Sequence, residues 1–292
     1  MIRQSFDLEF ITPCFCAGAN PAMAEIRAPS IRGQLRWWFR VLGSSAVQEA
    51  AVFGAVAGDT GTGSALRIAV ADFKRGLAWK PPAIDQNKAE NYTWHFASAS
   101  GKAPNAGPNV TGPRWQIQGA LPPGSTFKLH ITQLRPLPPE LKERLELARD
   151  AFLCFGTIGL RATRGLGAFH CPQAKPWRDL ITDISKAGFK VAVRQDPDAF
   201  PTWDSALKDW SSWLRFKFRK EFKATRYSAL GGIQPRQTSA VRFRPIQLPN
   251  EQLTWVALEA PHGRIMSRAV PEIITPNLLT GPAPSAPPNR GR

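Results

Sequence analysis

The sequence lacks any apolar run long enough to cross a lipid bilayer, because no segment reaches about 18 consecutive apolar residues. The opening residues carry Arg3, Asp7 and Glu9, so they contain no apolar signal core. These two absences predict a protein with no membrane partner.

Paired cysteines are lacking as well. Cys14, Cys16, Cys154 and Cys171 form no C-x-x-C pair and no dense framework, which predicts free thiols in a reducing cytoplasm. Neither Cys14 with Cys16 nor Cys171 with its neighbour His170 has the spacing of a metal site. We therefore predict no metal and no cofactor.

The usual signatures of catalysis are missing too. The four histidines are scattered through the chain, and no G-x-x-x-x-G-K-[ST] nucleotide loop occurs. We assign no catalytic residue and predict that the chain is not an enzyme.

Acidic residues are few, since 22 Asp and Glu face 38 Lys and Arg and leave a net charge of +16. Such a surplus favours a polyanionic partner, because each phosphate that a cation neutralises releases counterions. Ten Trp and 17 Phe offer stacking surfaces, although most aromatic side chains in any protein are core. With 43% hydrophobic residues the chain can also bury a sizeable core. The composition predicts a folded nucleic-acid-binding protein.

The segment Arg27–Arg40 holds the densest group of candidate phosphate ligands. Pro29 restricts its own backbone and that of its neighbour, which predicts Ser30 as the N-cap of a helix. The helix would have one apolar face and one basic face. The apolar face comprises Ile31, Leu35, Trp38 and Leu42, and the basic face comprises Arg32, Arg36 and Arg40.

Gly33 inside this helix has two interpretations. A glycine there should cost about 0.5–1 kcal/mol relative to alanine, so another backbone is expected to come close. In one interpretation a protein strand packs against a surface helix whose arginines are solvated. In the other, which we favour, phosphates lie at the helix N-terminus and along the arginines.

A second basic segment, Gly156–Phe169, places Arg161 and Arg164 among glycines. Glycines let a loop lie against a sugar-phosphate backbone, and arginines supply charge. We predict RNA contacts at Arg161, Arg164, Gly165 and Gly167. The alternative is a tight turn with exposed arginines.

A third basic group crowds the end of a helix predicted in the second half of the chain. It exceeds what matching the helix dipole requires, and its partner would be RNA or protein. Its members are Arg215, Lys217, Arg219, Lys220, Lys223 and Arg226.

Hydrophobic periodicity predicts strands at 5–10, 66–71, 115–121 and 127–134 and helices at 30–42, 48–53 and 140–155. We expect a flexible turn at 54–63 and a hairpin joining 115–121 to 127–134 through the turn 122–124. The order suits a ferredoxin-like α+β module. A similar order follows, with strands at 189–193, 241–248 and 253–258 and a helix at 203–218.

These elements divide the chain into domains. We predict ferredoxin-like (RRM-like) domains at 1–172 and 173–270 and a Pro-rich tail, 271–292, that is disordered or bound to a partner. The long connection 74–113 has the length of a functional or mobile loop.

Several motifs carry a resemblance to a known family. They are I-T-P-C-F-C-A-G-A (Ile11 to Ala19), A-P-S-I-R-G-Q-L-R-W-W-F-R (Ala28 to Arg40), V-F-G (Val52 to Gly54), T-R-G-L-G-A-F (Thr163 to Phe169) and P-R-Q-T-S-A-V-R-F-R (Pro235 to Arg244). With these motifs the chain resembles the RAMP superfamily of CRISPR proteins, and specifically the first RAMP subunit of type III-B (Cmr) effector complexes.

The resemblance implies two ferredoxin-like domains packed together and a subunit that holds the crRNA 3′ portion and the target RNA beside other RAMP and large subunits. It implies no nuclease activity, because the backbone subunits of such complexes cleave the target. The alternatives are a RAMP-type endoribonuclease that processes precursor crRNA through a histidine, and a structural adaptor.

We predict RNA contacts that are independent of base sequence, since contacts to the sugar-phosphate backbone fix register without reading bases. Trp37 would stack on a base or on an arginine. The predicted RNA-binding residues are Arg27, Ser30, Arg32, Arg36, Trp37, Arg40, Arg161, Arg164, Gly165 and Gly167.

The charge pattern predicts salt-dependent RNA binding. With about five phosphates engaged, log K against log salt should have a slope of about −3.5 for single-stranded RNA, from about −0.7 per contact. A filter-binding titration at several salt concentrations measures it. A flat response would rule out the electrostatic mode.

Overall fold

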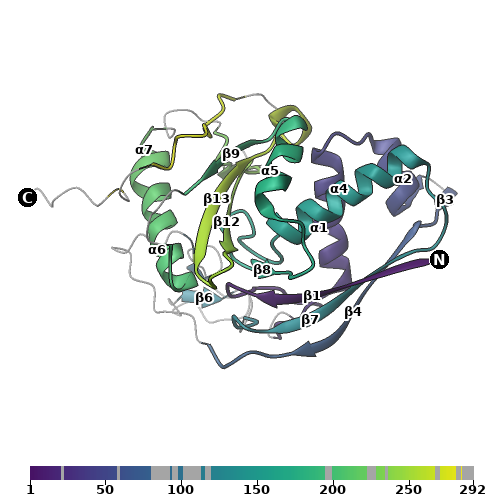
Figure 1. Ribbon diagram of the computed structural model, residues 1–292, viewed down its shortest axis with the longest axis horizontal. Helices are drawn as coiled ribbons and strands as arrows, with labels where there is room; N and C mark the ends of the chain where they lie inside the picture. The colour runs from purple at the N-terminus through teal and green to yellow at the C-terminus, as the bar shows by residue number, and fades with distance from the viewer. Residues whose placement is uncertain are drawn as a thin grey trace, which may run out of the picture.

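The computed structural model describes residues 1–20, 23–57, 60–79, 93, 98–100, 113–115, 120–194, 199–221, 228–233, 236–266, 270–280 and 284. The predictions for the greater part of 74–113 lie outside the described residues. Two larger antiparallel sheets organise the described part, and helices cover them (Figure 1). The fold is therefore of the predicted α+β class.

The first sheet has the strand order β4-β7-β1-β8, with all neighbours antiparallel. Its strands are β1 (Ile2–Phe10), β4 (Leu66–Lys74), β7 (Thr126–Gln133) and β8 (Phe169–His170). Apolar residues alternate along β1, so Phe6, Leu8 and Phe10 point into the core.

Two long helices, α1 (Ala28–Val41) and α4 (Pro139–Phe155), cover one face of this sheet (Figure 1). The chain order β1-α1-β4-β7-α4-β8 is that of a ferredoxin-like module. The predicted apolar face of α1 is confirmed, because Ile31, Leu35, Trp38 and Leu42 are buried. The helix α2 (Ala46–Phe53) follows α1 and begins with a capping box.

The start of α1 differs from the sequence prediction. Arg27 is its N-cap and Pro29 lies in its first turn, so Ser30 is not the N-cap. A proline fits the first turn because the N–H that it lacks has no partner within the helix. The hydroxyl of Ser30 instead accepts a hydrogen bond from the Cys16 thiol at 3.5 Å.

The second sheet has the order β12-β13-β9. Its elements are α5 (Trp177–Lys186), β9 (Lys190–Val193), α6 (Trp203–Ser212), the π-helical turn η1 (Trp213–Phe218), α7 (Arg219–Glu221), β12 (Val241–Gln247), β13 (Leu253–Glu259) and the 3-10 turn η2 (His262–Arg264). The order β9-α6-β12-β13 matches the first four elements of a ferredoxin-like module. The strands predicted here are confirmed, as is the helix, which changes to π geometry at Trp213.

Short strand pairs replace two of the predicted connections. The expected flexible turn contains the hairpin β2 (Ala55–Ala57) and β3 (Thr60–Thr62). The expected hairpin through residues 122–124 does not form, because β7 pairs with β1 and β4, whereas β6 (Pro113–Trp115) pairs with β5 (Ser98–Ser100). A last pair joins β10 (Gly232–Ile233) to β11 (Arg236–Gln237).

The start of the predicted tail is packed rather than loose. Ile273, Ile274 and Leu279 are buried in the core beside the second sheet. The main-chain N–H groups of Ile273 and Ile274 donate to the buried Glu259 carboxylate at 2.8 and 2.7 Å. The prediction of a disordered or partner-bound tail is therefore wrong for this part of it.

The glycine-rich segment 156–169 connects the two sheets. The Gly167 N–H donates to Pro13 O at 2.9 Å, and the Phe243 N–H of β12 donates to Thr163 O at 3.2 Å. Gly167 has φ +68, and a Cβ there would lie 1.8 Å from Ile158 O. Only glycine fits this close approach of two backbones.

Gly167 and Gly33 should respond oppositely to alanine. Gly167→Ala should destabilise the protein by about 3 kcal/mol or more, because it adds a backbone clash to left-handed strain. Gly33→Ala should stabilise it by about 0.5–1 kcal/mol, since a Cβ at this helical position meets no described atom within 4 Å. Urea unfolding of both variants measures the difference, and equal effects would contradict this packing.

Candidate nucleic-acid interface

The predicted row of arginines on α1 lies against α2. Arg36 Nε donates to Glu49 Oε1 at 2.7 Å, and Arg40 Nε donates to Glu49 Oε2 at 2.7 Å. Arg32 donates to the main-chain oxygen of Phe53. The side chains of Arg36 and Arg40 remain 42% and 54% exposed. The structure thus brings the row together and leaves it partly open to solvent.

Glu49 is the buried centre of this group, with its side chain 5% exposed. Hydrogen bonds from Arg40, and then from Arg36, hold the pKa of its carboxyl below the usual range, against the opposing effect of burial. One carboxylate is shared by two guanidinium groups. The group therefore keeps a net positive charge at the surface.

Trp37 stacks on an arginine from the second sheet. The guanidinium carbon of Arg242 lies 3.5 Å from the centroid of the Trp37 ring, and Arg242 Nη1 donates to Gln34 Oε1 at 3.4 Å. Of the two partners predicted for Trp37, the structure therefore has the arginine. Stacking on a base stays a prediction.

Gly33 lies on the exposed side of α1. No described atom other than those of its own helix and neighbours comes within 4 Å of the position of a Cβ. The interpretation of Gly33 as a helix–strand contact is therefore wrong for the described residues. Nearby, Arg27 forms an ion pair with the exposed Glu25 at 3.3 Å.

The glycine-rich segment places its predicted site residues inside the protein. Arg164 is 4% exposed and donates to Leu230 O at 2.7 Å, so it is not at a surface where a phosphate would bind. Gly165 and Gly167 are buried as well. Arg161 is half-buried, and its Nε donates to Thr93 O at 2.9 Å. The alternative of a tight turn with exposed arginines is wrong for Arg164.

Two arginines that were absent from the predicted site lie buried on the second sheet, and the first of them, Arg242, reaches Trp37 of α1. Arg242 and Arg244 project from β12 and are 6% and 2% exposed. No carboxylate among the described residues pairs with either, and burial lowers their pKa values to about 9 and about 10. Both stay cationic at neutral pH. Their signal in the sequence is the alternation V-R-F-R, in which arginines take every second position of a strand.

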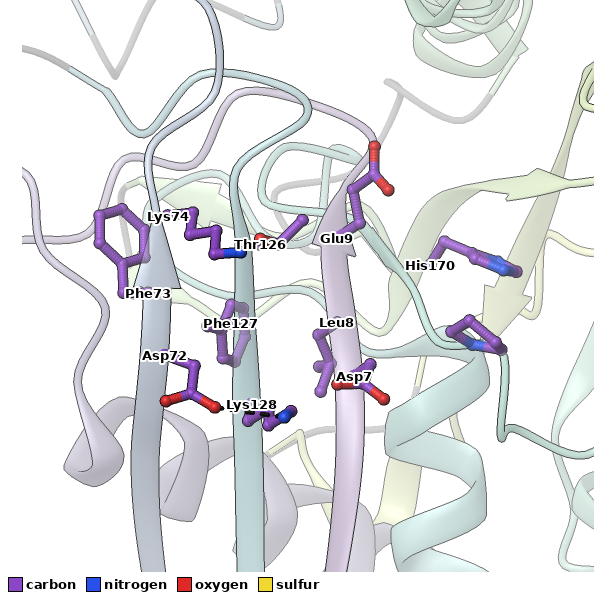
Figure 2. A pocket seen from close by; sticks show the side chains of 11 residues that line it. Asp7, Leu8, Glu9, Asp72, Phe73, Lys74, Thr126, Phe127, Lys128 and His170 are labelled. Carbon is purple, nitrogen blue, oxygen red and sulfur yellow. Dashed lines mark ion pairs between the residues drawn. The ribbon is translucent and has the colours of Figure 1, made fainter.

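A hollow of about 420 Å³ lies over the strand ends of the first sheet (Figure 2). Asp7 and Glu9 of β1, Asp72 of β4 and Lys128 of β7 line it, and Lys128 forms an ion pair with Asp72 at 3.2 Å. Its carboxylates outnumber its lysines. This end of the sheet is therefore a poor site for phosphate.

Comparison with known proteins places the chain in a family. The sequence profile of the RAMP superfamily matches residues 7–170, more than half of the chain. The chain therefore belongs to the RAMP superfamily.

Within the superfamily it is similar to the Cmr1 subunits. CRISPR system Cmr subunit Cmr1-1 of Pyrococcus furiosus is 27% identical over 185 residues, which are 60% of this chain and 49% of the relative. Subunit Cmr1-2 of the same organism is 48% identical over 42 residues, which are 14% of this chain and 22% of the relative. The chain thus spans about half the length of the first relative, and less of the second.

A solved structure supports the fold. The crystal structure of Cmr1 from Pyrococcus furiosus (apo form) superposes with a TM-score of 0.56 at 20% identity, covering 96% of this chain and 92% of that one. At this identity the likeness establishes the shared fold alone.

Two further observations concern membrane spans and metal sites in the described residues. No described helix has the length and hydropathy to cross a membrane. In the same part of the chain, no group of three or more His, Cys, Asp and Glu side chains could hold a metal ion.

Glu49 should make stability depend on acid pH. Its pKa is lowered in the folded state, so its ion pairs stabilise the protein above the unfolded pKa of about 4.3 and the stabilisation is lost as pH falls through the folded pKa. Glu49→Gln should lower the free energy of unfolding at pH 7 and flatten its pH dependence below about pH 4.5. Unfolding in urea between pH 3 and 7 tests this, with Glu143→Gln on the exposed side of α4 as the control. An unchanged pH profile in Glu49→Gln would contradict it.

Proposed function

We propose that this chain is an RNA-binding subunit of a type III-B CRISPR (Cmr) effector complex. In this role it holds the crRNA 3′ portion and the target RNA beside other RAMP and large subunits, and it catalyses no reaction of its own. Membership of the RAMP superfamily and the sequence similarity to Cmr1 support the proposal.

The observation that carries the proposal is the open surface at Gly33. A glycine in the middle of a helix costs stability, and no described protein atom uses the space that the missing side chain leaves. Arg32 and Trp37 lie next to it on the same helix, and Arg242 lies beneath Trp37. A sugar-phosphate backbone that runs along α1 would occupy the space beside Gly33 and contact the arginines of the same helix.

The N-terminus of α1 adds to the attraction. It has no side-chain cap and no acidic residue in its first turn, so no side chain of that turn offsets the positive end of its dipole. In the proposal, phosphates lie along the exposed face of α1, and Arg164 is not among their ligands. The ligands are Arg27, Arg32, Arg36, Arg40 and Arg161.

Variants on α1 separate this mode from a solvated surface. Gly33→Leu fills the open space, so it should weaken binding to single-stranded RNA at least fivefold without destabilising the protein. Glu49→Gln removes the carboxylate that competes with phosphate for Arg36 and Arg40. It should tighten binding about two- to fivefold, since surface ion pairs are worth up to about 1 kcal/mol.

Filter binding with two unrelated RNA sequences measures both effects, and Glu143→Gln on the exposed side of α4 is the charge-matched control for Glu49→Gln. Both sequences should respond alike. Affinity that is unchanged in Gly33→Leu and Glu49→Gln would overturn the assignment of this face. RNA recovered from the titrations in EDTA should be full length, and cleavage products would favour the endoribonuclease alternative.

A further inference from the structure

A second cavity, of about 620 Å³, lies where the two sheets meet. It is bounded by the segment from β8 to the start of α5 and by the end of β12 with the turn that follows. Its volume is in the range of small-ligand sites, about 300–1,000 Å³. The arginines of α1 are not among the residues that line it, so it is separate from the surface described above.

Arg244 lines this cavity from β12. Its guanidinium donates to Pro245 O at 2.6 Å and to Phe169 O, but its Nε is buried and has no hydrogen-bond partner in the described residues. The residue as a whole is only 2% exposed. A buried guanidinium without a carboxylate is expensive unless a charged partner approaches it. The cavity is the open space beside it.

The N-terminus of α5 opens onto the same cavity. Its N-cap is Pro176, which has no side chain that can accept hydrogen bonds, so the first N–H groups of this ten-residue helix lack a side-chain cap. Lys175 and Arg178 stand exposed at the rim, where Lys175 pairs with Asp150 at 3.0 Å and Arg178 lies over the Trp177 ring. Asp179 lies in the first turn of α5 and offsets part of the helix dipole, so the buried Arg244 is the stronger of the two sources of positive potential at this place.

The other residues that line the cavity indicate which class of ligand would fit it. Leu153, Ile246 and Leu248 form an apolar wall, and Trp177 offers a ring. Two exposed carboxylates, Asp179 and Glu251, also line the site, and they suit hydroxyl or amino donors rather than phosphate. The ligand should combine an anionic group, hydroxyls and a flat apolar body.

We propose that this cavity binds a mononucleotide, with its phosphate between Arg244 and the N-terminus of α5 and its base against the apolar wall. The hydroxyls of the sugar then face Asp179 and Glu251. The nucleotide is either free or the terminal nucleotide of an RNA strand, since both present the same groups. The proposal goes beyond RNA binding along α1 and does not depend on it.

Calorimetric titration of the full chain with AMP, adenosine and inorganic phosphate tests the proposal. AMP should bind at least tenfold more tightly than adenosine, because charge-assisted hydrogen bonds to phosphate are strong. It should also bind more tightly than inorganic phosphate, which lacks the base. AMP that binds no better than adenosine would overturn the proposal. The titration contains no RNA, so its outcome is independent of the proposed RNA binding.

Two variants locate the site. Arg244→Met keeps the apolar length of the side chain and should weaken AMP binding at least tenfold. The double variant Lys175→Ala with Arg178→Ala at the rim should weaken AMP binding about fivefold. If Arg244→Met does not fold, this double variant tests whether AMP binds in the cavity. Lys142→Ala is the control. Unchanged AMP affinity in the folded variants would overturn the assignment to this cavity.

Competition distinguishes the two sources. Short RNAs with a 5′-phosphate should displace AMP better than the same RNAs with a 5′-hydroxyl if the ligand is the end of a strand. Displacement by neither RNA identifies a free nucleotide. Stronger displacement by the 5′-hydroxyl RNA would contradict a phosphate site.

Discussion

Hydrogen bonds between main-chain groups of the glycine-rich segment 156–169 are the constraint on which the rest of the structure depends. On one side Gly167 donates to Pro13, in the loop that leads to α1, and on the other Thr163 accepts from Phe243 of β12. This segment therefore helps to fix the distance between α1 and the second sheet, together with the stacking of Trp38 on Phe189 and the hydrogen bond from Arg264 to Val41 O. The stacking of Trp37 on the arginine of β12 follows from that distance, because no main-chain hydrogen bond among the described residues joins α1 directly to β12. Glycines that are typical of a phosphate-binding loop serve to bring three stretches of protein backbone together.

Buried positive charge is concentrated in the same region, between the two sheets. Arg164, Arg242 and Arg244 are each no more than 6% exposed, and carbonyl oxygens and aromatic rings supply the interactions observed for the latter two. Desolvating a cation costs several kcal/mol that such neutral partners offset only in part. An anion that reaches this region meets a guanidinium through a low dielectric, where the attraction is several times stronger than at the surface. The electrostatic potential of the protein thus has a source between its sheets as well as along α1.

The elements whose local pattern agrees with their tertiary setting could be predicted from the sequence, and the others could not. The apolar faces of α1 and α4 keep a helical spacing of three and four residues, so pattern alone determines them. The prediction of a hairpin at 122–124 was wrong because β7 pairs with β1 on one edge and with β4 on the other. These pairings are long-range, so the residues of the turn do not indicate them. Arg164 was misplaced for a similar reason, since nothing local distinguishes an arginine that packs under a neighbouring loop from one in solvent. The packed start of the tail depends on the Glu259 carboxylate, which lies in β13, more than ten residues earlier in the chain.

Counting charges is therefore a weaker guide to binding than knowing how each charge is compensated. The net charge of +16 predicts attraction to a polyanion, but two of the three arginines on α1 already share a carboxylate. Exchanging that carboxylate for phosphate gains little energy at a solvated surface, so phosphate contacts alone give weak and salt-sensitive binding. Close contact with an RNA backbone needs space as well as charge, and the space on α1 is at Gly33. Gly33 contributes no charge, yet its position gives the strongest structural argument for where a nucleic acid would bind.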